Sequence, residues 1–295
     1  KKIIAVGNKA KKMLGKTPED IEVTRPIRNG VISDYIMTER MLKIYVKSAI
    51  AKRKIWGKPN ICVCVPSGVT DVQRRAACDA VYRTGAKNVY VLEEPFAAAI
   101  GAGVDIESAV GAMVVDIGAG TTDIAIVARG GVQHSSSIKI GGDDFDEAII
   151  RYMRKRHNVL LGESSAEQLK KDIGSVYPRE QDAIGYARGK ELVRGLPTKM
   201  AVKSSEMIEA CQEETDQILD SVREMLEAAP PELVSDISEH GIILAGGGSK
   251  IFGMDKLIMD KIGVPVVNIK NPDQVVATGA GTAHYYIKDG RTLEE

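Results

Sequence analysis

The chain has 295 residues, of which 44% are hydrophobic and 27% charged, values ordinary for a globular protein long enough for two lobes. Forty Lys and Arg balance forty Asp and Glu, so no general electrostatic argument favours nucleic acid or an anionic membrane. No run of about 18 apolar residues is present, which excludes a transmembrane helix. The four cysteines and four histidines lack metal-ligand spacing, so we expect no zinc site.

Strand-like and helix-like segments alternate along the chain, which predicts an α/β protein. In the first part we expect strands at 3–6, 61–65 and 89–92, and helices at 34–53, 71–84 and 95–101. The stretch Lys1–Gly7 has the pattern of the middle of a strand and no initiator Met precedes it. We therefore expect the sequence to be incomplete at its N-terminus.

The second part repeats the order strand, glycine turn, strand and helix. We expect strands at 112–115, 124–127, 132–140, 241–244 and 264–269. Helices are expected at 143–156, 165–173, 204–228, 254–262 and 272–288, with a basic, polar β-like region before residue 204.

The segment Asp116-Ile-Gly-Ala-Gly-Thr-Thr-Asp123 joins two expected strands and has the composition of a phosphate-binding turn. Its glycines allow close backbone approach, and consecutive N–H groups in such a turn form a concave anion site. Thr121 and Thr122 add hydroxyl donors, and Asp116 lies where it can hold Mg²⁺ through water. The alternative is a plain hairpin closed by threonine.

A second glycine segment, Ala245-Gly-Gly-Gly-Ser249, follows a strand and precedes a helix. Three glycines permit a flat ligand ring to pack on the backbone, although strand-to-helix turns often contain glycine for structural reasons alone. Neither a G-x-G-x-x-G nor a G-x-x-x-x-G-K-[ST] pattern occurs in the chain. A Rossmann dehydrogenase and a P-loop NTPase are therefore poor fits.

Two acidic segments each have a structural and a functional interpretation. Glu93 and Glu94 open a short helix, where its dipole stabilises acids, but a carboxylate there also suits the positioning of an attacking water. Glu167 and Lys170 are three residues apart on an expected helix, which is typical of a surface charge pair. They can contact a ribose and adenine only if the fold brings them near the glycine segment.

The loop Lys52-Arg-Lys-Ile-Trp-Gly-Lys-Pro59 contains the only tryptophan, Trp56, beside Ile55 and several cations. Trp56 either folds back onto the core or forms, with Ile55, an exposed apolar pair among basic residues. The second arrangement suits an anionic membrane surface.

Together these motifs resemble the superfamily of actin, heat-shock chaperone and sugar-kinase ATPases, and within it the MreB family of bacterial actins. The resemblance rests on the D-x-G-x-G-T-T-D turn, the upstream E-E-P-x-A-A-A-I-G and the downstream A-G-G-G. Segments along nearly the whole chain also match, among them 6–18, 25–34, 141–149, 230–238 and 263–266.

The resemblance implies a role for each matching position. Glu94 corresponds to the carboxylate that orients the hydrolytic water, and Asp116 to the residue near Mg²⁺. The residues implied in ATP binding are Gly118, Ala119, Gly120, Thr121, Thr122, Glu167, Gln168, Leu169, Lys170, Gly246, Gly247, Gly248 and Ser249. Ile55 and Trp56 fall where some relatives insert an apolar loop into the inner leaflet of the membrane.

The chain departs from the family pattern in two ways. Ala119 replaces the usual middle glycine of the turn, and its methyl group is tolerable if it points away from phosphate. The first phosphate loop of the family, an Asp-x-Gly-Thr hairpin, is expected in a segment before Lys1. We therefore expect this chain alone to bind nucleotide poorly.

The resemblance implies the actin-like, duplicated ribonuclease H-like fold, with two lobes around a nucleotide cleft. We expect lobe I at 1–110 completed by 271–295, and lobe II at 111–270 with 152–225 as its outer subdomain. The implied protein is cytoplasmic and peripheral at the inner face of the cell membrane. It forms head-to-tail filaments with ATP and organises cell-wall synthesis proteins to maintain rod shape, without binding nucleic acid. The alternative is a monomeric chaperone-type ATPase or sugar kinase.

Overall fold

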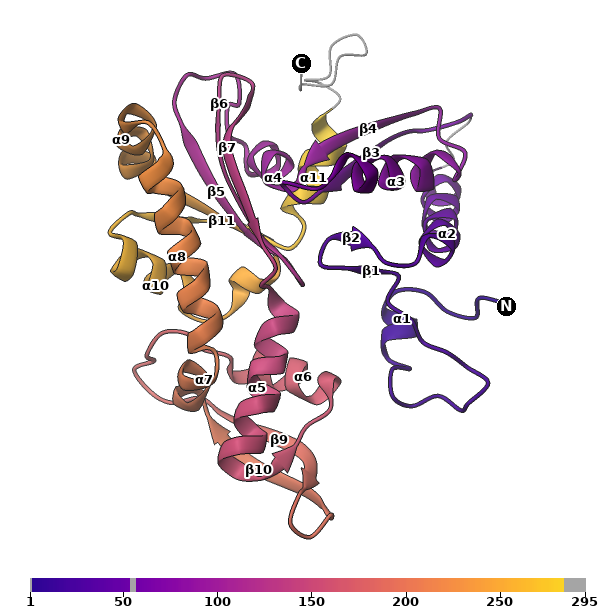
Figure 1. Cartoon of the computed structure of the whole chain (residues 1–295), viewed down its shortest axis with the longest axis vertical. Coiled ribbons are helices and arrows are strands. Elements are labelled where there is room, and N and C mark those ends of the chain that lie inside the picture. Colours follow the sequence, from indigo (N-terminus) through magenta and orange to yellow (C-terminus); the bar gives the residue numbers. More distant parts are fainter. Residues whose placement is uncertain (1, 54–56, 284–295) are drawn as a thin grey trace. The chain divides into compact units, whose positions relative to one another are not determined.

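A computed structural model describes residues 2–53 and 57–283 of the chain (Figure 1). The chain divides into two compact units. Unit 1 comprises residues 1–65 and 69–91, and unit 2 comprises residues 66–68 and 92–295. The first part of the chain separates from the rest at residue 91. The lobe boundaries expected at residues 110 and 270 stay predictions.

Unit 1 contains two long helices and two pairs of strands, β1 with β2 and β3 with β4. Its elements are α1 (Asn8–Lys11), β1 (Ile27–Arg28), β2 (Val31–Ile32), α2 (Tyr35–Arg53), β3 (Asn60–Val65), α3 (Asp71–Tyr82) and β4 (Asn88–Glu93), which pairs with β3 and ends in unit 2. Asp34 caps α2 by accepting a hydrogen bond from the Met37 N–H at 3.0 Å. α3 begins with a reciprocal capping box between Thr70 and Gln73.

The strand expected at residues 3–6 is absent, and this prediction was wrong. Residues 2–6 belong to no regular element, and the first helix begins at Asn8. An apolar run forms a strand only where another strand pairs with it, and no pairing of this segment occurs in the described part of the chain.

Unit 2 is built on a five-stranded sheet with the order β12-β11-β5-β6-β7. β5, β6 and β7 form an antiparallel meander, whereas β11 and β12 run parallel to β5. Their bounds are Ala112–Ile117 (β5), Thr122–Ala128 (β6), Gly131–Ile138 (β7), Ile242–Ala245 (β11) and Val266–Asn268 (β12). Every residue of β6 is buried, as expected for a central strand that is covered on both faces.

Helices cover both faces of this sheet (Figure 1). One face carries α8 (Gln212–Ala228), α9 (Pro231–His240) and α10 (Met254–Ile262), and the other carries α4 (Glu94–Ala102) and α11 (Val275–Thr282). α4 and α11 cross at glycines. A Cβ at Gly279 would overlap the Ala97 carbonyl oxygen, and one at Gly101 would overlap the Val275 carbonyl oxygen. The two helix backbones are therefore in direct contact.

The outer part of unit 2 is a smaller α/β layer that begins with α5 (Gly142–His157). It continues with β8 (Val159–Leu160), α6 (Glu163–Ile173), β9 (Ile184–Glu191), β10 (Pro197–Lys203) and α7 (Ser204–Ala210), and the 3₁₀ turn η1 (Gly248–Lys250) lies back at the main sheet. β8, β9 and β10 form an antiparallel sheet. The fully buried Phe145, Ile149 and Met153 of α5 join this layer to the main core.

The chain differs from expectation around residues 204–240. The single helix expected at 204–228 is two helices, because Cys211 has a backbone conformation outside the helical region (φ −100°, ψ 6°). α9 was not predicted. Its start at Pro230-Pro231 resembles a loop, yet proline is favourable in the first turn of a helix.

Candidate functional site

The turn predicted to hold phosphate connects β5 to β6 in unit 2. Asp116, near the end of β5, pairs directly opposite Asp123, near the start of β6. Between them, the Gly118 N–H donates to the Thr121 carbonyl oxygen at 2.8 Å, which closes the turn. We call residues 118–121 the phosphate turn. Opposite residues of an antiparallel pair point to the same side of the sheet, so both aspartates lie on one face beside it.

Thr122, also predicted to contact phosphate, already has a partner. Its side chain is fully buried, and its hydroxyl donates to the Ile140 carbonyl oxygen at 2.7 Å. This bond ties β6 to the segment that precedes α5. Donation to a phosphate by Thr122 would require this bond to break. The Thr121 side chain also has a partner, since it hydrogen-bonds the Asp123 carboxylate.

The N-terminus of α5 packs against the phosphate turn. The Gly142 N–H donates to the Gly118 carbonyl oxygen at 3.0 Å, and the Asp143 N–H donates to the Ala119 carbonyl oxygen at 2.7 Å. A Cβ at Gly141 would come within 2.6 Å of the Ala119 carbonyl group, so only glycine allows this approach. The positive end of a 16-residue helix dipole therefore lies beside the turn, which favours an anion there.

The second glycine segment, 246–248, meets the same end of the sheet. Ala245 lies opposite Asp116 in the parallel pairing of β11 with β5. Gly246 has a left-handed φ of +82°, and a Cβ on it would overlap the Asp116 carboxylate and the Ile117 carbonyl oxygen. Ser249 turns back and donates from Oγ to the Gly246 carbonyl oxygen at 2.7 Å. The structure thus brings together two glycine segments that are about 130 residues apart in sequence.

The four predicted residues of α6 have different surroundings. Lys170 lies 2.9 Å from the Asp146 carboxylate and donates to the Gly142 carbonyl oxygen, so it reaches the start of α5. Glu167 pairs with Lys171 at 2.7 Å, and Gln168 donates to Asp172 at 2.7 Å on the exposed side. Leu169 is 1% exposed and belongs to the core, so its side chain cannot face a nucleotide.

Three carboxylates near the phosphate turn have raised pKa values. Burial, followed by the charges of Asp123 and Asp116, raises the pKa of Glu94 to about 8. Burial and the charge of Asp123 raise the pKa of Asp116 to about 7, and burial raises the pKa of Asp123 as well. Each ionised acid disfavours ionisation of its neighbours, so a cation bound here would favour the ionised forms of the group.

Sequence reasoning missed one residue, Ser67, that joins this acidic group. The Ser67 N–H donates to Asp123 Oδ1 at 2.8 Å, and the Ser67 hydroxyl donates to the Glu93 carboxylate. Ser67 is 3% exposed. It follows Pro66 at the end of an apolar strand, a common setting for a turn, so the sequence held no signal that could have identified it.

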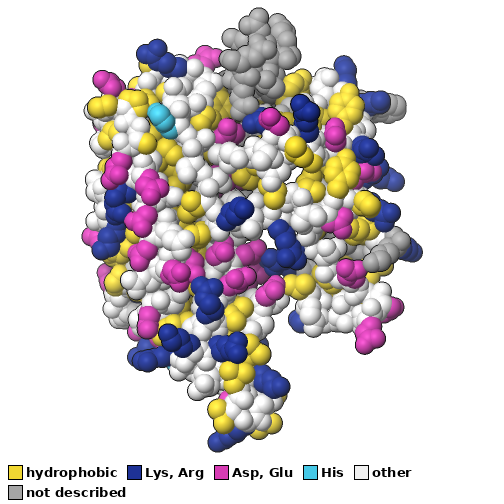
Figure 2. Space-filling model, viewed as in Figure 1, with side chains coloured by type: hydrophobic (Ala, Val, Ile, Leu, Met, Phe, Trp, Pro, Cys, Tyr) yellow, Lys and Arg dark blue, Asp and Glu magenta, His cyan; other side chains and the backbone are white. Residues whose placement is uncertain are grey.

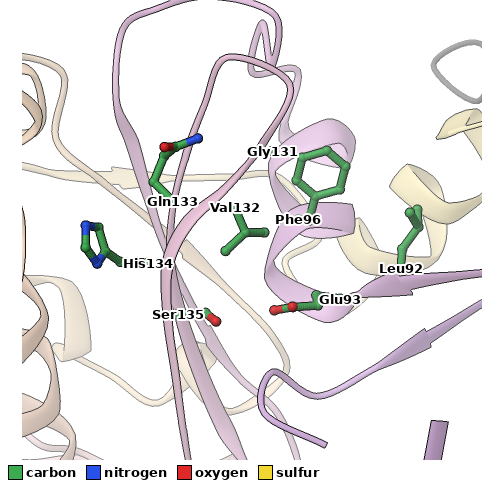
Figure 3. Close-up of a pocket in the computed structure, with 8 residues that line it drawn as sticks. All are labelled: Leu92, Glu93, Phe96, Gly131, Val132, Gln133, His134 and Ser135. Atoms are coloured by element: carbon green, nitrogen blue, oxygen red, sulfur yellow. The ribbon is translucent and has the colours of Figure 1, made fainter. Parts of the chain in front are cut away.

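A cavity of about 270 Å³ lies between the start of α4 and β7 (Figure 3). Its lining residues are Leu92, Glu93, Phe96, Gly131, Val132, Gln133, His134 and Ser135. The Glu93 carboxylate points toward Ser135 in this view. None of the predicted ATP-binding residues lines it, so the cavity is separate from the phosphate turn.

Two predictions concern residues or groups beyond this site. Ile55 and Trp56 lie outside the described residues. Within residues 2–53 and 57–283, no helix is both long and apolar enough to cross a bilayer. Over the same ranges, no three or more His, Cys, Asp or Glu side chains are arranged to hold a metal ion. A Mg²⁺ ion held by Asp116 would therefore depend on water and phosphate for its other ligands.

Comparison with known proteins gives consistent matches along the whole chain. The family model described as MreB/Mbl protein matches residues 1–292. The chain is 46% identical to the cell shape-determining protein MreB of Escherichia coli K12 over 283 residues, which are 96% of this chain and 82% of that protein. It is 41% identical to the cell shape-determining protein Mbl of Bacillus subtilis 168, over 95% of this chain and 84% of that protein.

Solved structures also match nearly the whole chain. MreB5 of Spiroplasma citri bound to ADP superposes with a TM-score of 0.90 at 35% identity, covering 96% of this chain and 85% of that one. The MamK double helical filament has a TM-score of 0.79 at 24% identity, over 95% of this chain and 85% of that one, which supports the fold alone. The expected α/β, actin-like fold is confirmed by these structures. By the extent of these matches, this chain belongs to the MreB/Mbl family.

Proposed function

We propose that this chain is a nucleotide-dependent, filament-forming bacterial actin that determines cell shape. The observation that carries the proposal is the meeting of the phosphate turn, the start of α5 and the segment 246–248 at Asp116. In this arrangement the backbone N–H groups of the turn and the helix dipole hold phosphate, while Gly246, Gly247, Gly248 and Ser249 lie beneath the nucleotide. Relatives solved with ADP and with AMPPNP support this proposal.

The residues present fit ATP with Mg²⁺. Glycine is required at Gly141 and Gly246 because a Cβ would collide with the turn or with Asp116, so the three segments of the proposed site pack closely on one another. Burial and neighbouring carboxylates raise the pKa values of Asp116 and Glu94, and a bound cation would favour their ionised forms. Asp116 would hold Mg²⁺ through water, and the ion would neutralise phosphate charge. Lys170 of α6 adds positive charge beside the start of α5, where it donates to the Gly142 carbonyl oxygen.

Glu94 is the residue that we assign to hydrolysis. Its carboxylate lies close enough to Asp116 and Asp123 for their charges to raise its pKa, which puts it beside the phosphate turn. It would orient the attacking water and accept its proton, a role that requires the ionised form. The proposed activity is therefore an ATPase.

The support for filament formation and cell-shape determination is the similarity to the relatives. The names of the MreB and Mbl relatives describe cell shape-determining proteins, and a filament of the same fold is known for MamK. In the proposed assembly, head-to-tail contacts between unlike surfaces give an open filament. The chaperone and sugar-kinase alternative has no such support among the relatives compared.

We also propose where the protein works. It is cytoplasmic and peripheral at the inner face of the membrane, where Ile55 and Trp56 contact lipid and cell-wall synthesis proteins are its partners. The cations Lys52, Arg53 and Lys58 that surround this pair support the membrane contact, because they attract anionic headgroups.

Sedimentation tests the filament proposal. We expect the full-length protein at micromolar concentration to pellet with ATP and Mg²⁺ and to stay in the supernatant without nucleotide. ADP serves as the matched nucleotide control, since hydrolysis is expected to weaken the filament. Identical pelleting under all three conditions would remove nucleotide from the assembly mechanism.

The membrane loop is tested by Ile55→Ser combined with Trp56→Ser. Loss of two apolar side chains removes a few kcal/mol of burial in lipid, so we expect vesicle binding to fall roughly tenfold or more. Flotation with vesicles that contain anionic lipid measures it. If flotation of the double variant equals that of the parent, the loop has no membrane role.

A further inference from the structure

Acidic side chains gather at the start of α5, and Lys170 of α6 reaches into them. The first two turns of α5 contain Asp143, Asp144, Asp146 and Glu147. Figure 2 shows Asp and Glu side chains gathered near the middle of this view, where α5 begins. Lys170 lies in the last turn of α6, and its Nζ is 2.9 Å from Asp146 Oδ1.

Two groups of α5 hold the Lys170 ammonium. Its Nζ donates to the Gly142 carbonyl oxygen and pairs with the Asp146 carboxylate. Gly142 and Asp146 are four residues apart, so they lie one above the other on the same face of the helix. We call these two residues the α5 clamp. An ammonium has three N–H donors, and the clamp occupies two of them.

The pair of Lys170 and Asp146 is largely shielded from water. The Lys170 side chain is 15% exposed and that of Asp146 is 11% exposed. Burial raises the pKa of Asp146 to about 6, and Lys170 opposes this rise, whereas the charges of Glu167 and Asp143 add to it. Two further carboxylates therefore lie near the pair and compete for the same ammonium. Asp146 holds it on the inner side, against α5.

The α5 clamp places this ammonium beside the phosphate turn. A Cβ built on Gly142 would lie 3.3 Å from Lys170 Nζ. The same point is 3.6 Å from the Gly118 carbonyl oxygen and 3.9 Å from Ala119 Cα, both of which belong to the turn. A lysine side chain has many rotamers of similar free energy, so its charge stays at one place only while a partner holds it.

We propose that Asp146 is a positioning residue for the nucleotide, because it holds the Lys170 ammonium beside the phosphate turn and leaves the third N–H for the ligand. The inference rests on the proposed nucleotide site and adds a residue that acts there through Lys170. Charge alone predicts the opposite effect, since a carboxylate near a phosphate site repels the ligand. Loss of the Asp146 charge should therefore weaken ATP binding, although it makes the site less negative.

The first experiment measures the position of Lys170 without nucleotide. Trace acetylation of the full-length protein with acetic anhydride, followed by mass spectrometry of its peptides, gives the relative rate at each lysine. In Asp146→Asn, Lys170 should react about fivefold faster or more, because its nitrogen has lost a charged hydrogen-bond partner. Lys261 of α10, which is 56% exposed, is the internal reference. Glu147→Gln is the matched control, since it removes the same charge from an exposed neighbour on α5.

The second experiment measures the affinity of the full-length protein for ATP with Mg²⁺ in a double-mutant cycle. Asp146→Asn should weaken binding about tenfold, and Glu147→Gln should leave it unchanged. In the Lys170→Met background the ammonium is absent, so adding Asp146→Asn should change the affinity by less than about twofold. A purely structural role of Asp146 would cost the same factor in both backgrounds. Urea unfolding verifies that each variant is folded under the conditions of the binding measurement.

Two results would overturn the inference. One is equal acetylation of Lys170 in Asp146→Asn and Glu147→Gln, and the other is an equal loss of affinity from Asp146→Asn with and without Lys170. If Asp146→Asn does not fold, Asp146→Glu replaces it with the same expectations, because the longer side chain keeps the charge but displaces the ammonium. Failure of the parent to bind ATP would remove the proposed function together with this inference. Normal binding by the parent and by every Asp146 variant would remove this inference alone.

Discussion

Replacing Gly279 with alanine is expected to destabilise the protein by about 2–4 kcal/mol, although alanine is normally the better helix former. The reason is the crossing of α11 over α4. The new Cβ would overlap the Ala97 carbonyl oxygen and come within about 3 Å of the Gly101 amide nitrogen (2.8 Å), both of which are backbone atoms of α4. Backbone cannot rotate away as a side chain can, so the helices must separate and lose contact along the crossing. Urea unfolding of the nucleotide-free chain measures the change.

The same helix supplies the control. Gly281 lies two residues further along α11, and a Cβ on it would meet nothing within 4 Å. Gly281→Ala is expected to leave stability unchanged or to raise it by up to about 1 kcal/mol through helix propensity. Equal effects of the two substitutions would show that the helices do not pack at the distance described.

Replacing Glu94 with glutamine or alanine in the full-length protein is expected to slow phosphate release about a hundredfold or more while ATP binding is retained. The carboxylate is the proposed acceptor of the proton from water, and neither replacement can accept it. Phosphate release under single-turnover conditions and the affinity for a fluorescent ATP analogue separate chemistry from binding. A normal rate of release in Glu94→Ala would refute the assigned role.

Glu94 also predicts a pH dependence of stability without nucleotide. Its pKa is raised in the folded chain to about 8, so the folded state binds the proton more tightly than the unfolded state. The free energy of unfolding should therefore fall as pH rises from about 5 to 8. Glu94→Gln removes this contribution and should be more stable than the parent at pH 8.5, by about 1–3 kcal/mol, and nearly equal to it at pH 5.

The matched control is Glu232→Gln. Glu232 also lies in the first turn of a helix beside a proline, but it is exposed. Its replacement should leave the pH dependence as in the parent. If Glu94→Gln and Glu232→Gln have the same pH profile, the raised pKa of Glu94 is not a property of the folded chain.

Local patterns were sufficient to predict most strands and helices of unit 2. The apolar runs that became β5, β6 and β11 lie between glycine turns, and each has a partner strand in the described chain. The run at 3–6 has no such partner and failed as a strand. The break at Cys211 was also missed, because the apolar positions continue with helical spacing across it. Pairing and helix breaks depend on tertiary contacts that periodicity does not contain.

The candidate site could likewise be predicted from the sequence only in part. The phosphate turn and the segment 246–248 were predicted from glycines that lie directly after expected strands. Their meeting at Asp116 depends on the parallel pairing of β11 with β5, for which only a family resemblance gave an indication. The bond from Ser67 to Asp123 joins residues 56 positions apart and leaves no trace in either local sequence. Leu169 was included through its neighbours on α6, although its own side chain faces the core.

Hydrogen exchange measured by mass spectrometry tests the proposed nucleotide site most directly. ATP with Mg²⁺ should slow exchange at the backbone amides of residues 118–122, 142–146 and 246–250 in the full-length protein, since these segments meet around the proposed phosphate position. Protection confined to other segments, with these three unaffected by saturating nucleotide, would contradict the proposed site.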